Sequence, residues 1–258
     1  MHPIPELSNP DIIELTKELG GKFRVPSDIH PEDLLFKFFR NSTPGEQSVI
    51  RYFESGYGDA NQIYHTVLSL LPHTKEPSVL DFAAGFGRVS RHLAAIMPTA
   101  RFTVSDIHQP AVEFHRSTLR IDALKSEAVP RDFLLPKDEF DFIFSLSFFS
   151  HMSNTLFFDW LQLLFSALKP DGYLLFTTHG DATMKSYPDL AKLYDPKTGC
   201  GYGLEMETDQ TDIANYGTAV TDFDYVFERI KRLPARMVTF RSAGWWGHQD
   251  EWIIQRIG

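Results

Sequence analysis

The sequence is short of cysteine: Cys200 is the only one among 258 residues. A single thiol can form neither an internal disulfide nor a cysteine-based zinc cluster, so we interpret Cys200 as a structural thiol. Long apolar runs are also missing, and none approaches the roughly 20 residues of a membrane helix. The N-terminal stretch MHPIPELSNPDIIEL lacks the basic and apolar regions of a signal peptide. We therefore expect a cytoplasmic protein with no membrane partner.

Positive charge is scarce as well. The chain has 25 lysines and arginines against 34 acidic residues, and its formal net charge is -9. Because nucleic-acid binding needs a basic surface, we expect no nucleic-acid partner. Hydrophobic residues make up 43% of the chain, which is enough to form one sizeable core.

The order of predicted elements divides the chain into two parts. Residues 1–75 read as a helical N-terminal segment or lid, with helices at 11–19, from Pro31, at 45–54 and at 59–71. Residues 76–258 form the main domain, in which short apolar strands alternate with helices, the pattern of a parallel sheet. The strands are expected at 78–82, 101–105, 124–126, 140–145, 173–178, 236–241 and 251–257. The last two are close enough in sequence to require an antiparallel hairpin, and residues 181–220 form an insertion with little periodicity.

One strand-to-helix turn carries the clearest functional signal. The stretch VLDFAAGFGRVSRHL starts at Val79 and passes from an apolar strand through Gly85 and Gly87 into a helix. Such turns bring the backbone close to a nucleotide. The carboxylate of Asp81, at the tip of the strand, would repel a pyrophosphate but attract an ammonium group. The turn therefore favours S-adenosylmethionine, which carries an ammonium group and no phosphate, over NAD.

A second acid, Asp106, ends the next predicted strand. At that position a carboxylate accepts hydrogen bonds from both ribose hydroxyls of a bound nucleoside. This role suits NAD and S-adenosylmethionine equally. Asp106 thus supports a nucleoside site without choosing between the two cofactors.

These motifs, with the later FDFIFS and LKPDGYLLFTT, resemble the successive motifs of class I S-adenosylmethionine-dependent methyltransferases over residues 78–180. The resemblance implies an α/β, Rossmann-like fold. Its mostly parallel seven-stranded sheet has the order 3-2-1-4-5-7-6 with strand 7 antiparallel, and helices cover both faces. The tail also resembles a bacterial subgroup associated with surface-glycan or secondary-metabolite assembly, which shares a Gly-Tyr-rich insertion and a Trp…HQD hairpin.

The resemblance also implies the cofactor contacts. The methionine half of S-adenosylmethionine would lie on the glycine turn, the ribose and adenine on the second strand end, and the adenine edge after the third strand. Ala83 stands where a first glycine is usual, and we expect it to be tolerated with φ below zero. The implied contacts are Asp81, Ala83, Ala84, Gly85, Gly87, Arg88, Asp106, Ile107, Ser126, Glu127, Ser145 and Leu146.

The acceptor is expected beyond the carboxyl ends of the strands, where open parallel sheets bind ligands. Three histidines follow such ends or precede the last strand: His151, His179 and His248, with Asp250 beside the last. Histidine suits removal of a hydroxyl proton near neutral pH, so these four residues are the catalytic candidates and His151 ranks first. Their spacing carries no metal signature, and we expect no metal.

Aromatic and hydroxyl side chains supply the candidates for acceptor binding. Aromatic faces can stack on sugars or planar acceptors, and core packing is the alternative for each of them, in particular for one of the two tryptophans. The substrate-binding candidates are Tyr57, Ser147, Tyr202, Tyr216, Trp245 and Trp246.

Together these patterns predict a methyltransferase that acts on a small-molecule or sugar acceptor, with O-methylation favoured. One alternative is an NAD(P)-dependent oxidoreductase, which Asp81 disfavours, as does Arg88 at the place of a third glycine. The other is a non-catalytic S-adenosylmethionine-binding scaffold or regulatory protein. The sequence leaves the oligomeric state open.

Overall fold

A computed structural model describes residues 7, 9–43, 45–204 and 216–258. Within them the main sheet has seven strands in the order β3-β2-β1-β4-β5-β9-β8. The pairs β1–β4, β2–β3 and β4–β5 are parallel, whereas β9 is antiparallel to both neighbours. This is the predicted order, and the class I fold is confirmed. The strands are β1 (Ser78–Phe82), β2 (Arg101–Asp106), β3 (Asp122–Lys125), β4 (Phe140–Ser145), β5 (Leu168–His179), β8 (Ala235–Trp245) and β9 (Gln249–Arg256).

The chain separates into two compact units. The first unit comprises residues 1–77 and 83–126, and the second comprises residues 78–82 and 127–258. This division differs from the boundary at residue 75 that the sequence suggested, because the helices of the N-terminal segment pack with the segment that follows β1. Each unit is described by itself below.

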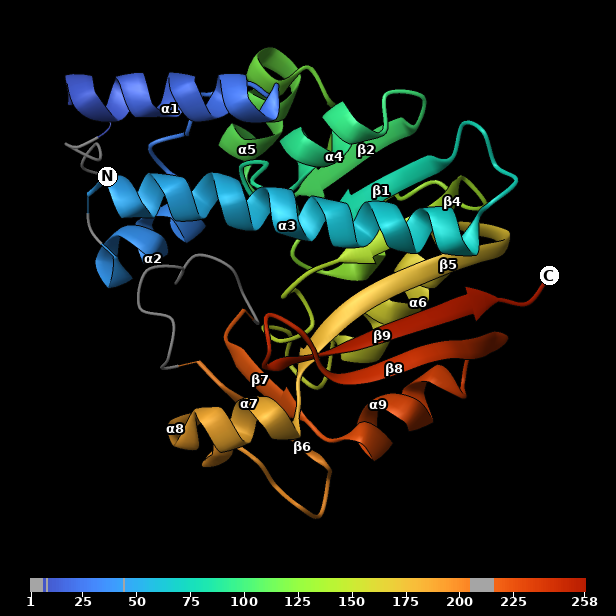
Figure 1. The fold of residues 1–258 in the computed structure, drawn as a ribbon. Helices are drawn as coiled ribbons and strands as arrows, with labels where there is room; N and C mark the ends of the chain where they lie inside the picture. The colour runs from blue at the N-terminus through green and yellow to red at the C-terminus, as the bar shows by residue number, and fades with distance from the viewer. Residues whose placement is uncertain (1–6, 8, 44, 205–215) are drawn as a thin grey trace. The chain divides into compact units, whose positions relative to one another are not determined.

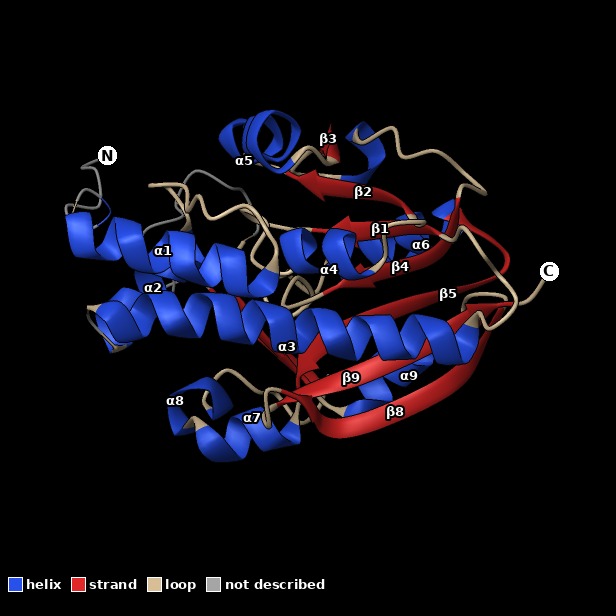
Figure 2. Ribbon diagram, turned by 45° about the horizontal axis from the view of Figure 1, so that its top comes forward, coloured by secondary structure: helices blue, strands red, loops and turns tan. Residues whose placement is uncertain are grey.

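The first unit is mainly helical. Its helices α1 and α3 lie side by side (Figures 1 and 2). Asn9 caps α1 by accepting a hydrogen bond from the amide of Asp11. The core of this unit includes Phe36, Tyr52 and Phe53, all almost fully buried. The helices are α1 (Pro10–Phe23), α2 (Leu34–Ser42), α3 (Glu46–Leu70), α4 (Ser90–Ile96) and α5 (Gln109–Phe114), which continues as a π-helical turn at His115–Leu119.

Helix α3 corrects the sequence analysis, which expected two helices at 45–54 and 59–71. It is one helix of 25 residues that runs through Gly56 and Gly58. A Cβ atom at Gly56 would lie 2.3 Å from the carbonyl oxygen of Arg88. The glycine that looked like a helix break therefore allows close packing, because only a residue without a side chain fits there.

The second unit holds β1, β4 and the long strands β5, β9 and β8, which Figure 2 shows as neighbours. Asp222 caps α9 by accepting a hydrogen bond from the amide of Tyr225. The described part of the 181–220 insertion is more regular than predicted, because it contains two short helices and a strand pair; residues 205–215 lie outside the described residues. The further elements are a 3₁₀ turn (Pro130–Asp132), α6 (Phe157–Ala167), α7 (Asp181–Ser186), α8 (Pro188–Ala191), β6 (Cys200–Gly203), β7 (Thr218–Thr221) and α9 (Phe223–Ile230).

Among the described residues, no helix has the length and apolar character needed to span a lipid bilayer.

Candidate functional site

The glycine turn of the first unit has an alternating left-handed backbone. Ala83, Gly85 and Gly87 have φ of 63°, 57° and 79°. Ala83 therefore contradicts the expectation of a φ below zero. An alanine in this conformation is strained by about 1–2 kcal/mol, because its Cβ crowds the following carbonyl. The turn geometry is kept in spite of the missing glycine.

Three amide groups of this turn donate hydrogen bonds within the protein. The amide of Ala84 donates to the carbonyl of Ser105 at 3.1 Å, and the amide of Gly87 donates to the carbonyl of Ala84 at 3.3 Å. The amide of Gly85 donates to Oδ2 of Asp106 at 2.8 Å. A turn that holds a pyrophosphate offers its amides to the phosphate oxygens. These three amides are already used, and one of them faces a carboxylate, so the turn is unsuited to a phosphate.

Asp106, at the end of β2, is buried and held in one orientation. Its Oδ1 accepts hydrogen bonds from the backbone amide and the ring Nδ1 of His108, both at 2.9 Å. The bond to Asp106 raises the pKa of His108 above its ordinary value. With the Gly85 amide on Oδ2, three of about four acceptor positions of the carboxylate are used. One position remains for a ribose hydroxyl, where the sequence analysis expected Asp106 to hold two.

The two glycines of the turn play different roles. A Cβ at Gly85 would meet nothing within 4 Å, whereas a Cβ at Gly87 would lie 2.3 Å from Cδ1 of Leu119. The half-exposed backbone at Gly85 therefore faces open space that a ligand can enter. Gly87 is buried and is required by packing.

Arg88 also has a structural role in place of the implied cofactor contact. Its buried guanidinium pairs with the carboxylate of Asp59 on α3 at 2.5 Å and donates to the hydroxyl of Ser55 at 3.1 Å. The side chain thus fastens the turn to α3. Tyr57 on the same helix packs against Phe23 and His92, with ring centroids 4.9 Å and 5.9 Å apart. The side chain of Tyr57 is 40% exposed, and its contact with the acceptor stays a prediction.

Arg91 was not predicted, although it is the most highly bonded side chain of the turn. Its fully buried guanidinium uses all five donors. The sequence could not reveal this, because the partners come from segments up to 65 residues away. They are the carbonyls of Gly87 (2.9 Å), Phe86 (3.3 Å), Pro26 (2.9 Å) and Asp28 (2.7 Å) and the hydroxyl of Tyr52 (3.4 Å).

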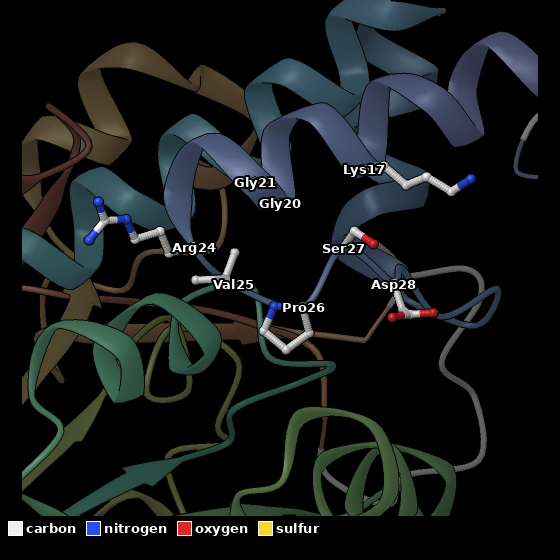
Figure 3. A pocket seen from close by; sticks show the side chains of 8 residues that line it. All are labelled: Lys17, Gly20, Gly21, Arg24, Val25, Pro26, Ser27 and Asp28. Atoms are coloured by element: carbon white, nitrogen blue, oxygen red, sulfur yellow. The ribbon is translucent and has the colours of Figure 1, made fainter.

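A hollow of about 550 Å³ lies at the end of α1. Figure 3 shows the side chains of Lys17, Arg24 and Asp28 around it, pointing apart from one another. A binding site for a small ligand has a few polar groups that converge. This hollow lacks that arrangement among its lining residues, so it is not the candidate site.

In the second unit, three loops that follow or join the strands bring the predicted histidines together. The ring centroids of His151 and His179 are 6.0 Å apart, and those of His179 and His248 are 6.2 Å apart. Convergence of the three histidines, which the sequence predicted from strand order, is therefore observed. Among the described residues no group of three His, Cys, Asp or Glu could hold a metal ion.

His179 is unsuited to act as a base. Its Nδ1 donates to the carbonyl of Ala219 at 3.2 Å, so Nε2 is the acceptor, and Nε2 faces the amide nitrogen of Gln249 at 3.3 Å. Burial is the main cause that lowers the pKa of His179 to about 3. A ring with that pKa takes up protons poorly at neutral pH. We therefore reassign His179 from a catalytic to a positioning role.

His151 has a different environment. Its Nδ1 donates to the carbonyl of Gly217 at 2.8 Å, which leaves the ring's lone pair on Nε2. Its ring stacks on Tyr216 with the centroids 4.8 Å apart and the planes at 13°. Tyr216 pairs with Met152 in an isolated bridge, so the end of the insertion is fastened to the loop after β4. This geometry orients His151 as a base should be oriented.

His248 and Asp250 do not form a pair. Nδ1 of His248 faces the carbonyl of Trp246 at 3.2 Å, and Oδ1 of Asp250 accepts from the amide of Ala243 at 3.0 Å. The carboxylate of Asp250 packs so closely on Gly180 that a Cβ there would lie 1.8 Å from Oδ2. Burial raises the pKa of Asp250. Asp250 therefore supports the β8–β9 turn and is removed from the catalytic candidates.

The remaining predicted residues fall into buried and accessible sets. The indole of Trp245 is fully buried, whereas Trp246 is 42% exposed, so core packing accounts for one of the two. The hydroxyl of Ser145 donates to the carbonyl of Phe82 at 3.2 Å. The others are placed as follows: Asp81 is buried on β1, Ser126 is buried after β3, Tyr202 is half-buried on β6, and Ala84, Ile107, Leu146 and Ser147 are half-buried. Glu127 is exposed.

Gln249 is the second residue that sequence reasoning missed. It lies between His248 and Asp250, and in the β5–β9 register it stands opposite His179, while Asp250 stands opposite Thr178. Because side chains alternate along a strand, Gln249 and His179 share one face of the sheet. The alternation of the HQD stretch could have revealed this once β9 was paired with β5.

Comparison with known proteins agrees with this fold. Residues 79–172 match the family model described as a methyltransferase domain. An S-adenosylmethionine-dependent methyltransferase from Clostridium acetobutylicum has a similar structure, with a TM-score of 0.55 and 13% identity over 77% of this chain and 91% of that one. CalS10, an S-adenosylmethionine-bound amino pentose methyltransferase from Micromonospora echinaspora, also has a TM-score of 0.55 and 13% identity, over 78% of this chain and 91% of that one.

A sequence relative is similar over a shorter stretch. Ribosomal RNA small subunit methyltransferase C of Salmonella choleraesuis is 42% identical over 78 residues, which are 30% of this chain and 22% of that protein. The chain thus spans less than a quarter of the length of this curated relative.

Proposed function

Because the chain belongs by its sheet and its methyltransferase domain to the class I S-adenosylmethionine-dependent methyltransferases, we propose that it transfers a methyl group to a small-molecule or sugar acceptor, with oxygen favoured. The observation that carries the proposal is the glycine turn. Its amides are used within the protein and one of them faces the carboxylate of Asp106. Such a turn suits a nucleoside that carries no phosphate.

The residues of the turn fit S-adenosylmethionine. The open space at Gly85 admits the ligand, and Asp106 keeps one acceptor position for a ribose hydroxyl. Ile107 would pack on the adenine, and the carboxylate of Asp81 would attract the ammonium group. When bound, the cofactor supplies an activated methyl group on its sulfonium.

The histidines of the second unit support acceptor chemistry. Nε2 of His151 would take up the hydroxyl proton of an acceptor whose oxygen receives the methyl group. His179 and Gln249 would position the acceptor. Tyr216, which stacks on His151, would hold the imidazole ring in place.

The names of the similar proteins bear on the acceptor class. CalS10 is named as an amino pentose methyltransferase, which is in line with a sugar acceptor. The ribosomal RNA enzyme matches over a small part of its length, and a net charge of -9 opposes binding of RNA phosphates. We therefore favour a small acceptor over RNA.

Calorimetric titration with S-adenosylmethionine, S-adenosylhomocysteine and NADH tests the proposal. We expect both adenosyl ligands to bind and NADH not to bind. Asp106→Asn should weaken the adenosyl ligands, whereas Asp122→Asn, an exposed aspartate on β3, should leave them unchanged. Binding of NADH alone would overturn the proposal. Cofactor binding without transfer to any of a panel of hydroxyl and amine acceptors would favour the scaffold alternative.

A further inference from the structure

Two glutamines on β9 differ in how their polar atoms are used. The amide nitrogen of Gln255 donates to the carbonyl of Asp171 at 3.1 Å and to the hydroxyl of Tyr173 at 2.9 Å, and its Oε1 accepts from Arg236. Gln249 is more deeply buried, with 2% of its surface exposed. Its Oε1 is buried and has no hydrogen-bond partner in the described part of the chain.

The orientation of the Gln249 amide follows from its neighbours. Nδ1 of His179 donates to a carbonyl, so its Nε2 must accept. The group that faces this Nε2 must therefore be the NH₂ of Gln249, at 3.3 Å. The second hydrogen of that NH₂ goes to Oγ of Ser147 at 2.7 Å. Both donors are used, and the oxygen is left on the other edge of the amide.

A buried oxygen without a partner is rare in folded proteins and calls for a specific explanation. The NH₂ group of Gln249 bonds to Ser147 and His179, and its Oε1 can still accept one hydrogen bond. The group that completes this arrangement must be a donor. The amide of Gln249 contacts His179, one of the three histidines beside which the acceptor is proposed to bind.

Ser147 supplies the complementary group. Its Oγ accepts from Gln249, and no described residue accepts the hydrogen of its hydroxyl. The side chain is half-buried, so a ligand can reach it. Its backbone has φ of 59°, and its amide donates to Oγ1 of Thr177 at 2.8 Å, which holds the residue in place after β4.

We propose that Gln249 and Ser147 form a specificity pair that recognises a vicinal diol of the acceptor by hydrogen bonding. One hydroxyl donates to Oε1 of Gln249, and the neighbouring oxygen accepts from the hydroxyl of Ser147. The pair selects polyols and sugars over amines and carboxylic acids of similar size, because an ammonium offers no acceptor and a carboxylate offers no donor. This inference rests on the proposed function, whose acceptor site it specifies.

Binding of methyl β-D-glucopyranoside, monitored by NMR with S-adenosylhomocysteine at saturation, tests the pair. Gln249→Leu and Ser147→Ala should each weaken binding of the glucoside about five- to tenfold, which is the worth of one hydrogen bond, and butylamine should not bind. The affinity for S-adenosylhomocysteine should stay unchanged. Gln255→Leu is the matched control on the same strand and should leave both affinities as they are.

The outcomes distinguish a failure of the diol assignment from a failure of the proposed function. Wild-type protein that binds S-adenosylhomocysteine but not the glucoside overturns the diol assignment, and so does equal binding by the wild type and Gln249→Leu. A bound structure with an ordered water on Oε1 in place of the diol also overturns it. Failure to bind S-adenosylhomocysteine counts against the proposed function instead. If Gln249→Leu does not fold, Gln249→Met keeps the shape and carries the same expectation.

Discussion

The glycine turn of the first unit and the histidine loops of the second unit are built in opposite ways. The turn and Asp106 lie within one stretch, residues 83–108, and the amides of Ala84, Gly85 and Gly87 bond to residues of that stretch. The histidine loops join residues 147–151, 179, 216–219 and 248–250, and the imidazoles of His151 and His179 depend on partners far along the chain. Because its hydrogen bonds stay within one stretch, the turn can be predicted from the sequence. Distant partners decide what each histidine can do.

The largest expected effect lies where the turn itself depends on distant residues. Arg91→Met removes a side-chain donor from four carbonyls and from the hydroxyl of Tyr52, which bonds to Asp33. We expect a loss of about 3 kcal/mol or more in the free energy of unfolding, since breaking a buried charged network is costly. Urea unfolding measures it. Arg131→Met, at an exposed side chain, should change stability by less than about 0.5 kcal/mol.

His151→Ala tests the histidine loops. We expect kcat to fall about 100-fold, the usual contribution of a general base, while calorimetry shows an unchanged affinity for S-adenosylhomocysteine. His65→Ala, at an exposed position on α3, is the control and should keep full activity. An unchanged kcat for His151→Ala would remove this residue as the base. A kcat loss as large in His179→Ala would contradict the positioning role assigned to His179.

His108 should make the stability of the turn depend on pH. Its pKa is raised in the folded state by the bond to Asp106, so the stabilisation is fully present below the unfolded value of 6.5 and is lost as the pH rises through the folded pKa. His108→Gln should therefore be less stable than the wild type at about pH 5.5 and similar to it at about pH 8.5. Urea midpoints at the two pH values measure the difference. If the urea midpoints of the wild type and His108→Gln differ by the same amount at both pH values, the charge of the imidazole ring contributes nothing to stability.

The smallest effect concerns the strained alanine. Ala83→Gly relieves a positive φ of 63° but adds flexibility to the unfolded chain, so we expect a net gain of about 0.5–1 kcal/mol. Ala84→Gly has no such strain to relieve and should lose about 0.5–1 kcal/mol. Thermal unfolding of the two variants compares them. A loss in Ala83→Gly would mean that the methyl group of Ala83 makes packing contacts that outweigh its strain.

The fold could be predicted because its signals are periodic and local. Apolar runs such as FDFIFS mark β4, and the short connection between the last two strands requires β9 to be antiparallel to β8. The break proposed within α3 was wrong, since the role of Gly56 depends on the carbonyl of Arg88 that packs against it. A glycine that ends a helix and a glycine that admits a neighbour look the same in a sequence.

For the candidate site, the sequence by itself determined the strand-to-helix turn, the acid at each strand end and the convergence of three histidines, because strand order and chain direction place these groups. The tertiary structure decided their roles. The register of β5 against β9 sets Gln249 opposite His179 and Asp250 opposite Thr178. As a result, Nε2 of His179 contacts the amide of Gln249, and the carboxylate of Asp250 bonds to the β8–β9 turn. A one-residue shift would exchange those partners, because side chains alternate along a strand, and only the paired strands fix that register.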